Sequence, residues 1–400
     1  MKEILILIQR NLLEALQYFL YGSYTLPDLT YILGGRFLSS ESLLKLKRLF
    51  DEVRPWLPDI VSLLGNPRIS EEEYAKVLSY VYGIWEEIIT DVNDVNRDLE
   101  VKEIPLGLSY DSWFIKGGRS ERYKAVHLLR EYLLGEEVDK LFLRCLVHGS
   151  VATLDDVVGF SDLDTAFIIR ASVIKDFRKL VRVRRIASQI LSFTYFFDPF
   201  MHHGPYYISE VDLGFYPEAY FPLVLFENGF DLIDPIKSLK ASVRPSEEIT
   251  DEMLKRFEIF FKERVNNPCF IRDCYDLEWV LGNVMILPVL YLQRKTGVFR
   301  YKREALALAR EDFTEIEWES VELASLVRAS FKSRPKVKEW LLRLSLMLHF
   351  PEIIRSWCRC DLESLEEVRN VLRFLGDNYI FKVLNFIEII KSKLDLRWNV

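Results

Sequence analysis

Two aspartates, Asp162 and Asp164, have the type and spacing of residues that bind a metal ion. Only Leu163 separates them, and an apolar stretch, residues 166–169, follows directly after Thr165. This pattern predicts a strand that begins at Asp162, in which alternate side chains point to the same face. Neighbouring carboxylates repel one another, and a hard divalent cation such as Mg²⁺ relieves that repulsion. The sequence therefore predicts a site for a divalent cation here.

A glycine–serine pair upstream supplies a complementary feature. Residues 141–147 form an apolar segment that predicts a strand, and Gly149 and Ser150 follow it as a turn into a short helix or loop. Backbone N–H groups at such a turn bind anions, and glycine lets a phosphate approach the backbone closely. One unit is therefore expected to hold both a divalent cation and a polyphosphate.

This unit resembles the signature of the DNA polymerase beta-like nucleotidyltransferase superfamily. A strand ends in Gly149 and Ser150, eleven residues follow, and Asp162 and Asp164 then lead into an apolar strand. The resemblance implies that the two aspartates bind a pair of Mg²⁺ or Mn²⁺ ions, and that Gly149 and Ser150 hold the phosphates of an NTP, with ATP the expected donor. It also implies transfer of a nucleoside monophosphate to an acceptor hydroxyl with release of pyrophosphate.

The resemblance further implies a third metal-binding acid on a nearby strand. Residues 206–216, YYISEVDLGFY, predict a strand in which Glu210 and Asp212 share one face. Asp212 is the preferred catalytic and metal-binding residue, which would complete the metal shell and accept the proton of the nucleophile. Glu210 on the same face and Asp198 in the segment FFDPF are the alternatives, and the sequence leaves the choice between Asp212 and Glu210 open.

Three other features carry weaker signals. Lys302 lies in a segment similar to one in small aminoglycoside-type nucleotidyltransferases, which implies contact with a phosphate; an exposed first turn of a helix is the favoured interpretation. His202 and His203 are interpreted as a structural loop, with a substrate contact as the alternative. The basic residues of the predicted helix 172–197 are interpreted as a solvated face.

Composition limits the class of protein. Half of the residues are hydrophobic and 14% are aromatic, which excludes a disordered or fibrous chain. A net charge of −7 argues against bulk nucleic-acid binding and favours a small molecule or a protein as the acceptor. The N-terminus lacks the apolar core of a signal peptide, and the longest apolar run, residues 284–292, is interrupted by Pro288. We therefore expect a cytoplasmic protein that is not bound to membranes.

The order of the predicted elements indicates an α+β fold with a small mixed sheet. Apolar residues spaced by three and four predict helices before residue 140 and after residue 246, and strands alternate with helices between them. We therefore expect an N-terminal helical region (1–140), a nucleotidyltransferase core (141–240) and a C-terminal helical domain (241–400). The alternatives in function are a non-catalytic nucleotide-binding or regulatory protein and an RNA-directed nucleotidyltransferase.

Overall fold

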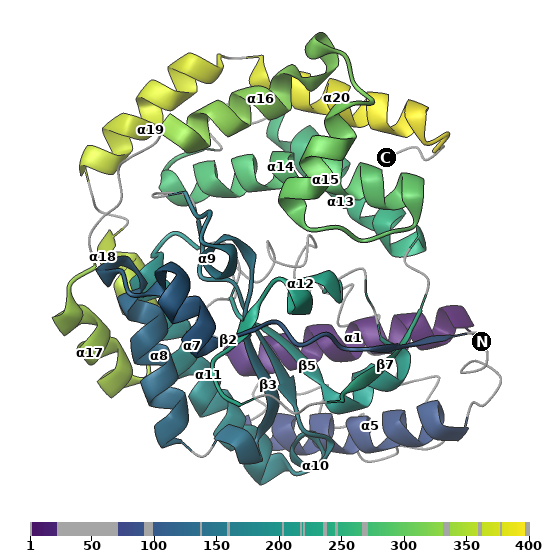
Figure 1. Cartoon of the computed structure of the whole chain (residues 1–400), viewed down its shortest axis with the longest axis vertical. Helices are drawn as coiled ribbons and strands as arrows, with labels where there is room; N and C mark the ends of the chain where they lie inside the picture. The colour runs from purple at the N-terminus through teal and green to yellow at the C-terminus, as the bar shows by residue number, and fades with distance from the viewer. Residues whose placement is uncertain are drawn as a thin grey trace.

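The structure, a computed structural model, describes most of the chain. The described residues are 2–21, 71–91, 99–136, 138–157, 161–201, 204–216, 218, 221–234, 238–244, 247–265, 271–330, 337–358, 362–376 and 378–396. In Figure 1 a strand-containing part occupies the lower half, and a group of C-terminal helices lies above it.

A five-stranded mixed sheet forms the centre of the strand-containing part. Its strand order is β2 (Leu108–Ser109), β6 (Phe230–Asp231), β3 (Phe142–Val147), β4 (Thr165–Ile169) and β5 (Tyr206–Ser209). β3 pairs with β4 in antiparallel fashion, and β4 pairs with β5 in parallel. Every residue of β3 and β4 is buried, as expected for apolar strands covered on both faces. The α+β class with a mixed sheet is therefore confirmed.

A buried ion pair joins β3 to β6. Arg144 donates from Nε to Oδ1 of Asp231 at 2.8 Å and from Nη2 to Oδ2 at 2.6 Å. Both side chains are almost completely buried. A two-pronged pair of this kind compensates for the desolvation of its charges only when the geometry is kept, so it fixes how the short strand β6 lies against β3.

Helices cover the sheet with apolar faces. The long helix α11 (Phe177–Phe197) packs against α1 (Lys2–Tyr21), α5 (Glu71–Asp91) and α8 (Lys124–Gly135). In α1, Leu12, Leu16, Phe19 and Leu20 are buried at the spacing of one helix face. The N-terminal segment therefore belongs to the same core as the sheet.

Two strands also lie in the region 1–140, which the sequence predicts to be mostly helical. This segment also supplies β2 at the edge of the main sheet and β1 (Glu100–Glu103), which pairs in antiparallel fashion with β7 (Lys240–Val243). The sequence of β1 is Glu-Val-Lys-Glu, which has too few apolar residues to show an alternating pattern. Pairing with distant partners, and not local propensity, makes these segments strands.

The C-terminal helices form a group around α14. This group comprises α13 (Glu247–Val265), α14 (Cys274–Thr296), α15 (Lys302–Arg310), α16 (Glu315–Ser330), α19 (Leu362–Leu375) and α20 (Tyr379–Lys393). Within the described residues, α14 alone is long and apolar enough to cross a membrane, and 89% of that stretch is buried inside the protein. Core helices of soluble proteins have the same length and composition, so α14 by itself does not indicate a membrane.

Two further C-terminal helices pack on the core and not on this group. α17 (Glu339–Leu348) and α18 (Glu352–Cys358) lie against α11. Ser345 of α17 donates a hydrogen bond to the hydroxyl of Ser192 of α11 at 2.8 Å. The segment 241–400 therefore contributes to both parts of the molecule and is not a single helical bundle.

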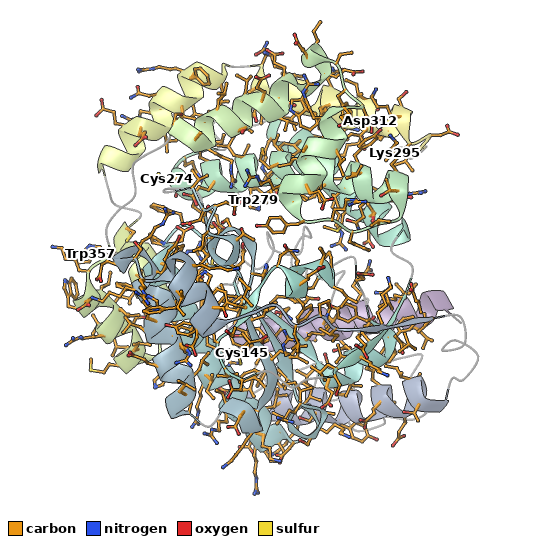
Figure 2. All side chains as sticks on the ribbon, in the orientation of Figure 1. Cys145, Cys274, Trp279, Lys295, Asp312 and Trp357 are labelled. Carbon is orange, nitrogen blue, oxygen red and sulfur yellow. The ribbon has the colours of Figure 1, made fainter. Side chains whose placement is uncertain are left out.

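The cysteines in the described part of the chain are buried. Cys145 lies in β3, Cys274 begins α14 and Cys358 ends α18. Figure 2 places Cys145 among the side chains of the sheet and Cys274 in the C-terminal helices. Their burial agrees with ordinary core residues.

Candidate functional site

The turn at Gly149 joins β3 to the short helix α9 (Gly149–Thr153). Gly149 has a φ of +69°, in the left-handed region that favours glycine. A Cβ atom at this position would lie 2.3 Å from Oδ2 of Asp164, so any side chain would also clash with that carboxylate. The expected turn into a short helix is confirmed, and Asp164 lies against its backbone.

Asp162 and Asp164 precede β4 and do not belong to it, because β4 begins at Thr165. The backbone N–H of His148 donates to the carbonyl of Asp164 at 3.0 Å, which extends the β3–β4 pairing by one step. Beyond that step β3 has already turned at Gly149, so the β3–β4 ladder ends there. The strand predicted from Asp162 is therefore too long at its start. Asp162 is nevertheless buried, and Asp164 is half-buried.

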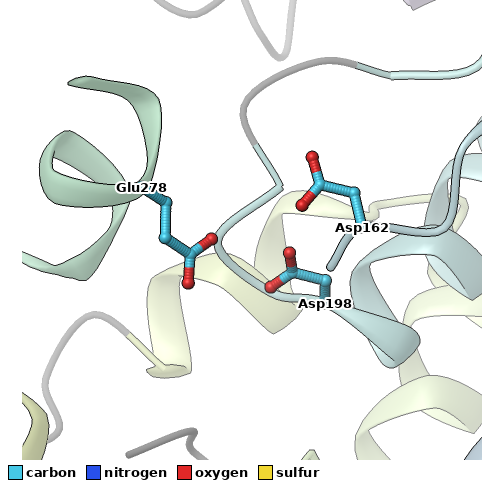
Figure 3. Close-up of side chains that lie close together, drawn as sticks. All are labelled: Asp162, Asp198 and Glu278. Atoms are coloured by element: carbon cyan, nitrogen blue, oxygen red, sulfur yellow. The ribbon is translucent and has the colours of Figure 1, made fainter. Parts of the chain in front are cut away.

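Asp162 forms a buried acidic group with two residues from other parts of the chain. One carboxylate oxygen from each of Asp162, Asp198 and Glu278 lies within 4.8 Å of the others, and Figure 3 shows the three side chains pointing toward one another. We call these three residues the acidic group. Asp198 directly follows α11, and Glu278 lies in α14. Carboxylates this close in the interior repel one another, and oxygen ligands are those that hard divalent cations prefer. The acidic group can therefore bind a metal ion.

Asp212, the expected third ligand, lies elsewhere. β5 ends at Ser209, and residues 210–215 form a 3₁₀ helix in place of the predicted strand. Because β4 and β5 are parallel, with Ile169 opposite Ser209, Asp212 follows the carboxyl end of β5 whereas Asp162 precedes the amino end of β4. The five residues of β4 span about 16 Å at ~3.3 Å each. Asp162 and Asp212 therefore lie at opposite ends of the parallel strands β4 and β5.

Both acids of this segment have structural partners. Asp212 is fully buried and accepts a hydrogen bond from the N–H of Ser209 at 3.1 Å, which caps the 3₁₀ helix. Glu210 accepts one from the N–H of Ala171 at 2.7 Å, at the start of helix α10 (Ala171–Ile174). Of the three alternatives that the sequence offers, the structure brings Asp198 to Asp162, and not Asp212 or Glu210.

Two basic residues of the C-terminal helices, Lys302 and Arg328, lie near these carboxylates. Burial and the nearby charge of Arg328 lower the pKa of Lys302 to about 8, although the carboxylates of Asp164 and Asp162 oppose this shift. Burial likewise lowers the pKa of Arg328, against the opposing effect of Asp162, Glu278 and Asp164. Lys302 begins α15 and Arg328 lies in the last turn of α16. The structure therefore brings Lys302 to the two aspartates of the motif.

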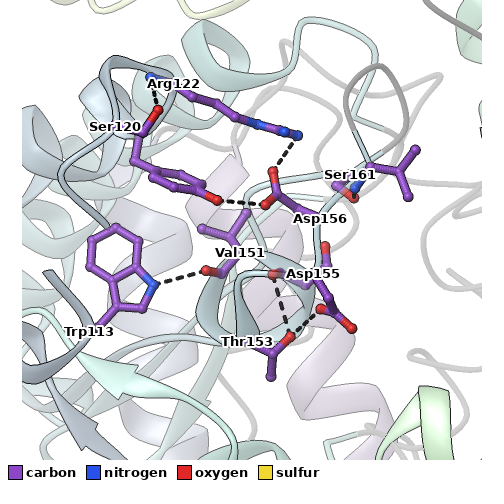
Figure 4. A network of polar contacts seen from close by, with 11 residues as sticks. Trp113, Ser120, Arg122, Val151, Thr153, Asp155, Asp156 and Ser161 are labelled. Atoms are coloured by element: carbon purple, nitrogen blue, oxygen red, sulfur yellow. Dashed lines mark hydrogen bonds and ion pairs between the residues drawn. The ribbon is translucent and has the colours of Figure 1, made fainter. Parts of the chain in front are cut away.

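A polar network holds α9 and the loop that leads to Asp162 (Figure 4). Asp156 forms an ion pair with Arg122 and accepts a hydrogen bond from the hydroxyl of Tyr123 at 2.7 Å. The indole N–H of Trp113 donates to the carbonyl of Val151 at 3.0 Å, within α9. These contacts tie α9 and Asp156, which follows it, to the residues before α8.

The other sequence features do not join the site in the described residues. On α11, Lys179 pairs with Asp176 at 3.6 Å, and Arg184 pairs with Glu71 at 3.5 Å. Ion pairs of this exposed kind agree with a solvated helix face. His202 and His203 lie outside the described residues.

Sequence reasoning did not find Glu278. It lies in a helix that is buried on nearly all sides, and it comes from a segment more than a hundred residues after Asp162. An acid within such an apolar helix is the one local signal that could have found it, because an unpaired charge is rarely tolerated there. Its partners depend on the packing of α14 against the core.

No family model, curated protein or solved structure matches this chain. The likeness to nucleotidyltransferases therefore rests on the Gly149–Asp164 motif itself.

We predict that Asp212 makes the stability of the protein depend on pH. Burial raises its pKa from 3.8 to about 6, although hydrogen bonds from Ser209, Gln9, Trp85 and Tyr82 oppose the shift. The folded state therefore keeps a proton that the unfolded chain loses between about pH 4 and 6, so stability falls as the pH rises through this window. Between pH 7 and pH 5 the wild type should gain about 1 kcal/mol of unfolding free energy relative to Asp212→Asn. Urea unfolding at the two pH values measures this difference, and identical pH dependence in the two proteins would contradict the assignment.

We also predict that the acidic group binds a divalent cation. Glu278→Gln removes one charged oxygen ligand, so Mn²⁺ should bind about tenfold more weakly or worse in calorimetric titration. Glu319→Gln is the matched control, because Glu319 pairs with Lys382 on the surface of the same helical group. Equal weakening by both substitutions would show only a general effect of charge and would exclude this site.

Proposed function

We propose that the protein is a metal-dependent nucleotidyltransferase that moves a nucleoside monophosphate from an NTP to a hydroxyl-bearing acceptor. The observation that carries the proposal is the convergence on Asp162 of two further buried carboxylates, Asp198 and Glu278. It occurs two residues away from Asp164, whose carboxylate lies against the Gly149 turn. The residues proposed to hold the cation and those proposed to bind the phosphates are thus close together, which supports this chemistry.

The carboxylates and the turn have separate roles in this proposal. Asp162, Asp198 and Glu278 hold a divalent cation, Mg²⁺ or Mn²⁺, and Asp164 supplies the second carboxylate of the motif. When bound, such a cation neutralises phosphate oxygens and polarises the α-phosphorus toward attack. The backbone at Gly149 and Ser150 binds the phosphates. Asp212 has no part in the reaction, since its carboxylate caps the 3₁₀ helix.

The basic side chains of Lys302 and Arg328, from the C-terminal helices, bind the triphosphate. The acceptor oxygen forms a bond to the α-phosphorus, the bond from that phosphorus to the bridging oxygen breaks, and pyrophosphate leaves; the hydroxyl proton passes to a carboxylate or to water. Lys302 and Arg328 compensate the negative charge of the leaving group. ATP is the expected donor, and the supply of NTP in the cytoplasm agrees with a cytoplasmic enzyme.

A non-catalytic nucleotide-binding or regulatory protein is the second candidate. It would use the same turn at Gly149 and the same basic residues, Lys302 and Arg328. It would bind ATP with Mg²⁺ without releasing pyrophosphate. The RNA-directed alternative gains no support from α11, where Lys179 and Arg184 are engaged in ion pairs. A small molecule or a protein is therefore the favoured acceptor.

Substitution of Asp162 tests the catalytic proposal. Asp162→Asn should reduce transfer of label from α-labelled ATP, measured over a panel of hydroxyl acceptors with Mg²⁺ or Mn²⁺, by about a hundredfold or more. Asp212→Asn is the matched control and should keep at least about half of the wild-type rate. Transfer that survives in Asp162→Asn would exclude the site, and nucleotide binding without transfer by the wild type would favour the non-catalytic candidate.

Lys302 tests how the nucleotide is held. Lys302→Ala should weaken the binding of ATP with Mg²⁺ by about tenfold or more, because a charge-assisted contact to phosphate contributes ~1.5–3 kcal/mol. Lys295→Ala removes a lysine that pairs with Asp312 at 2.7 Å on the surface of the same helical group, and it should leave the affinity unchanged. Calorimetric titration measures both, and unchanged affinity in Lys302→Ala would remove Lys302 from the site.

A further inference from the structure

Lys302 is flanked in sequence by two residues that contact the end of α9. The hydroxyl of Tyr301 lies 2.9 Å from Oγ1 of Thr153, and Nη1 of Arg303 lies 3.7 Å from Oδ2 of Asp155. Thr153 in turn forms a hydrogen bond with Oδ1 of Asp155. The four side chains therefore form a closed chain of contacts, with Lys302 between its two ends.

The direction of these hydrogen bonds follows from the donors present. Asp155 as a carboxylate only accepts, so Thr153 donates its proton to Asp155, and Tyr301 must donate to Thr153. Burial raises the pKa of Tyr301 to about 12, so its hydroxyl keeps this proton at neutral pH. The Tyr301–Thr153 bond is thus a fixed donor–acceptor pair between the first residue before α15 and the last residue of α9.

The body of α15 packs against α14, and its nine residues bury the small side chains of Ala305 and Ala309. Tyr301 provides no side-chain cap for it. The pair between Arg303 and Asp155 is weak, because the side chain of Arg303 is 80% exposed. Of the two side-chain contacts that join residues 301–303 to residues 153–155, the half-buried hydroxyl pair is therefore the stronger, and it ties the start of α15 directly to α9.

We propose that Tyr301 and Thr153 are positioning residues that hold Lys302 toward the phosphates of the nucleotide. The inference rests on the function proposed above and adds the contact that aligns the C-terminal helices with the Gly149 turn. Thr153 belongs to the short helix that begins at Gly149, so the same helix that would bind the phosphates also fixes the lysine that approaches them. Tyr301 and Thr153 do not themselves touch the nucleotide in this account.

The test is a set of substitutions read by the affinity for α,β-methylene-ATP with Mg²⁺ in calorimetric titration of the full chain. Tyr301→Phe and Thr153→Val each remove one partner of the bond and keep the shape of the side chain. Each should weaken binding about three- to tenfold, the range of one neutral hydrogen bond. Tyr291→Phe is the matched control, since its hydroxyl donates to Asp312 at 3.1 Å on the same helical group. This control should bind like the wild type.

Combined substitutions separate positioning from a general structural effect. If the bond acts as a unit, the double variant Thr153→Val with Tyr301→Phe binds no more weakly than either single variant. If the bond acts through Lys302, Tyr301→Phe has no further effect once Lys302 is alanine. Equal weakening by Tyr301→Phe with and without Lys302, or wild-type affinity in Tyr301→Phe, would overturn the inference.

The same titrations also test the proposed function separately from this inference. A wild type that does not bind the analogue removes the proposed function and this inference with it. A wild type that binds, is weakened by Lys302→Ala and is unaffected by Tyr301→Phe removes this inference alone.

Discussion

Three buried carboxylates within reach of one another set the main physical constraint on this molecule. Asp162, Asp198 and Glu278 come from a loop, from the end of a helix and from a second helix, and each has to be desolvated to reach the others. Removal of an ionised carboxylate from water costs several kcal/mol unless positive charge or hydrogen bonds compensate it. The charges of Lys302 and Arg328 compensate part of this cost, and a cation bound between the three carboxylates would compensate more of it.

The remainder of the structure brings these acids together from two sides. The sheet and α11 fix Asp162 and Asp198, while α14 carries Glu278 from the C-terminal helices. A cation held by all three would therefore join the two parts of the molecule. The contact between α9 and α15 acts in the same direction, since it places Lys302 beside the aspartates of the motif. In the proposed function, nucleotide binding would therefore depend on the alignment of the two parts.

Local chemistry was enough to predict part of this site. The turn at Gly149 follows from the residue types of a few neighbours, and the structure shows both the left-handed backbone and the close carboxylate that require glycine there. Asp212 shows where such reasoning ends. Alternation along a strand predicts which side chains share a face. Only the parallel register of β4 and β5 decides that Asp212 lies at the opposite end of the strands from Asp162. An acid in an apolar helix marks Glu278 as unusual, but its meeting with Asp162 and Asp198 depends on the packing of α14 against the core.

The most direct test of the acidic group is the position of a bound metal. Crystals grown with Mn²⁺ would show it in an anomalous difference map. This account predicts a peak coordinated by carboxylate oxygens of Asp162, Asp198 and Glu278. A map with no peak there, or a structure in which these three side chains point apart, would contradict it.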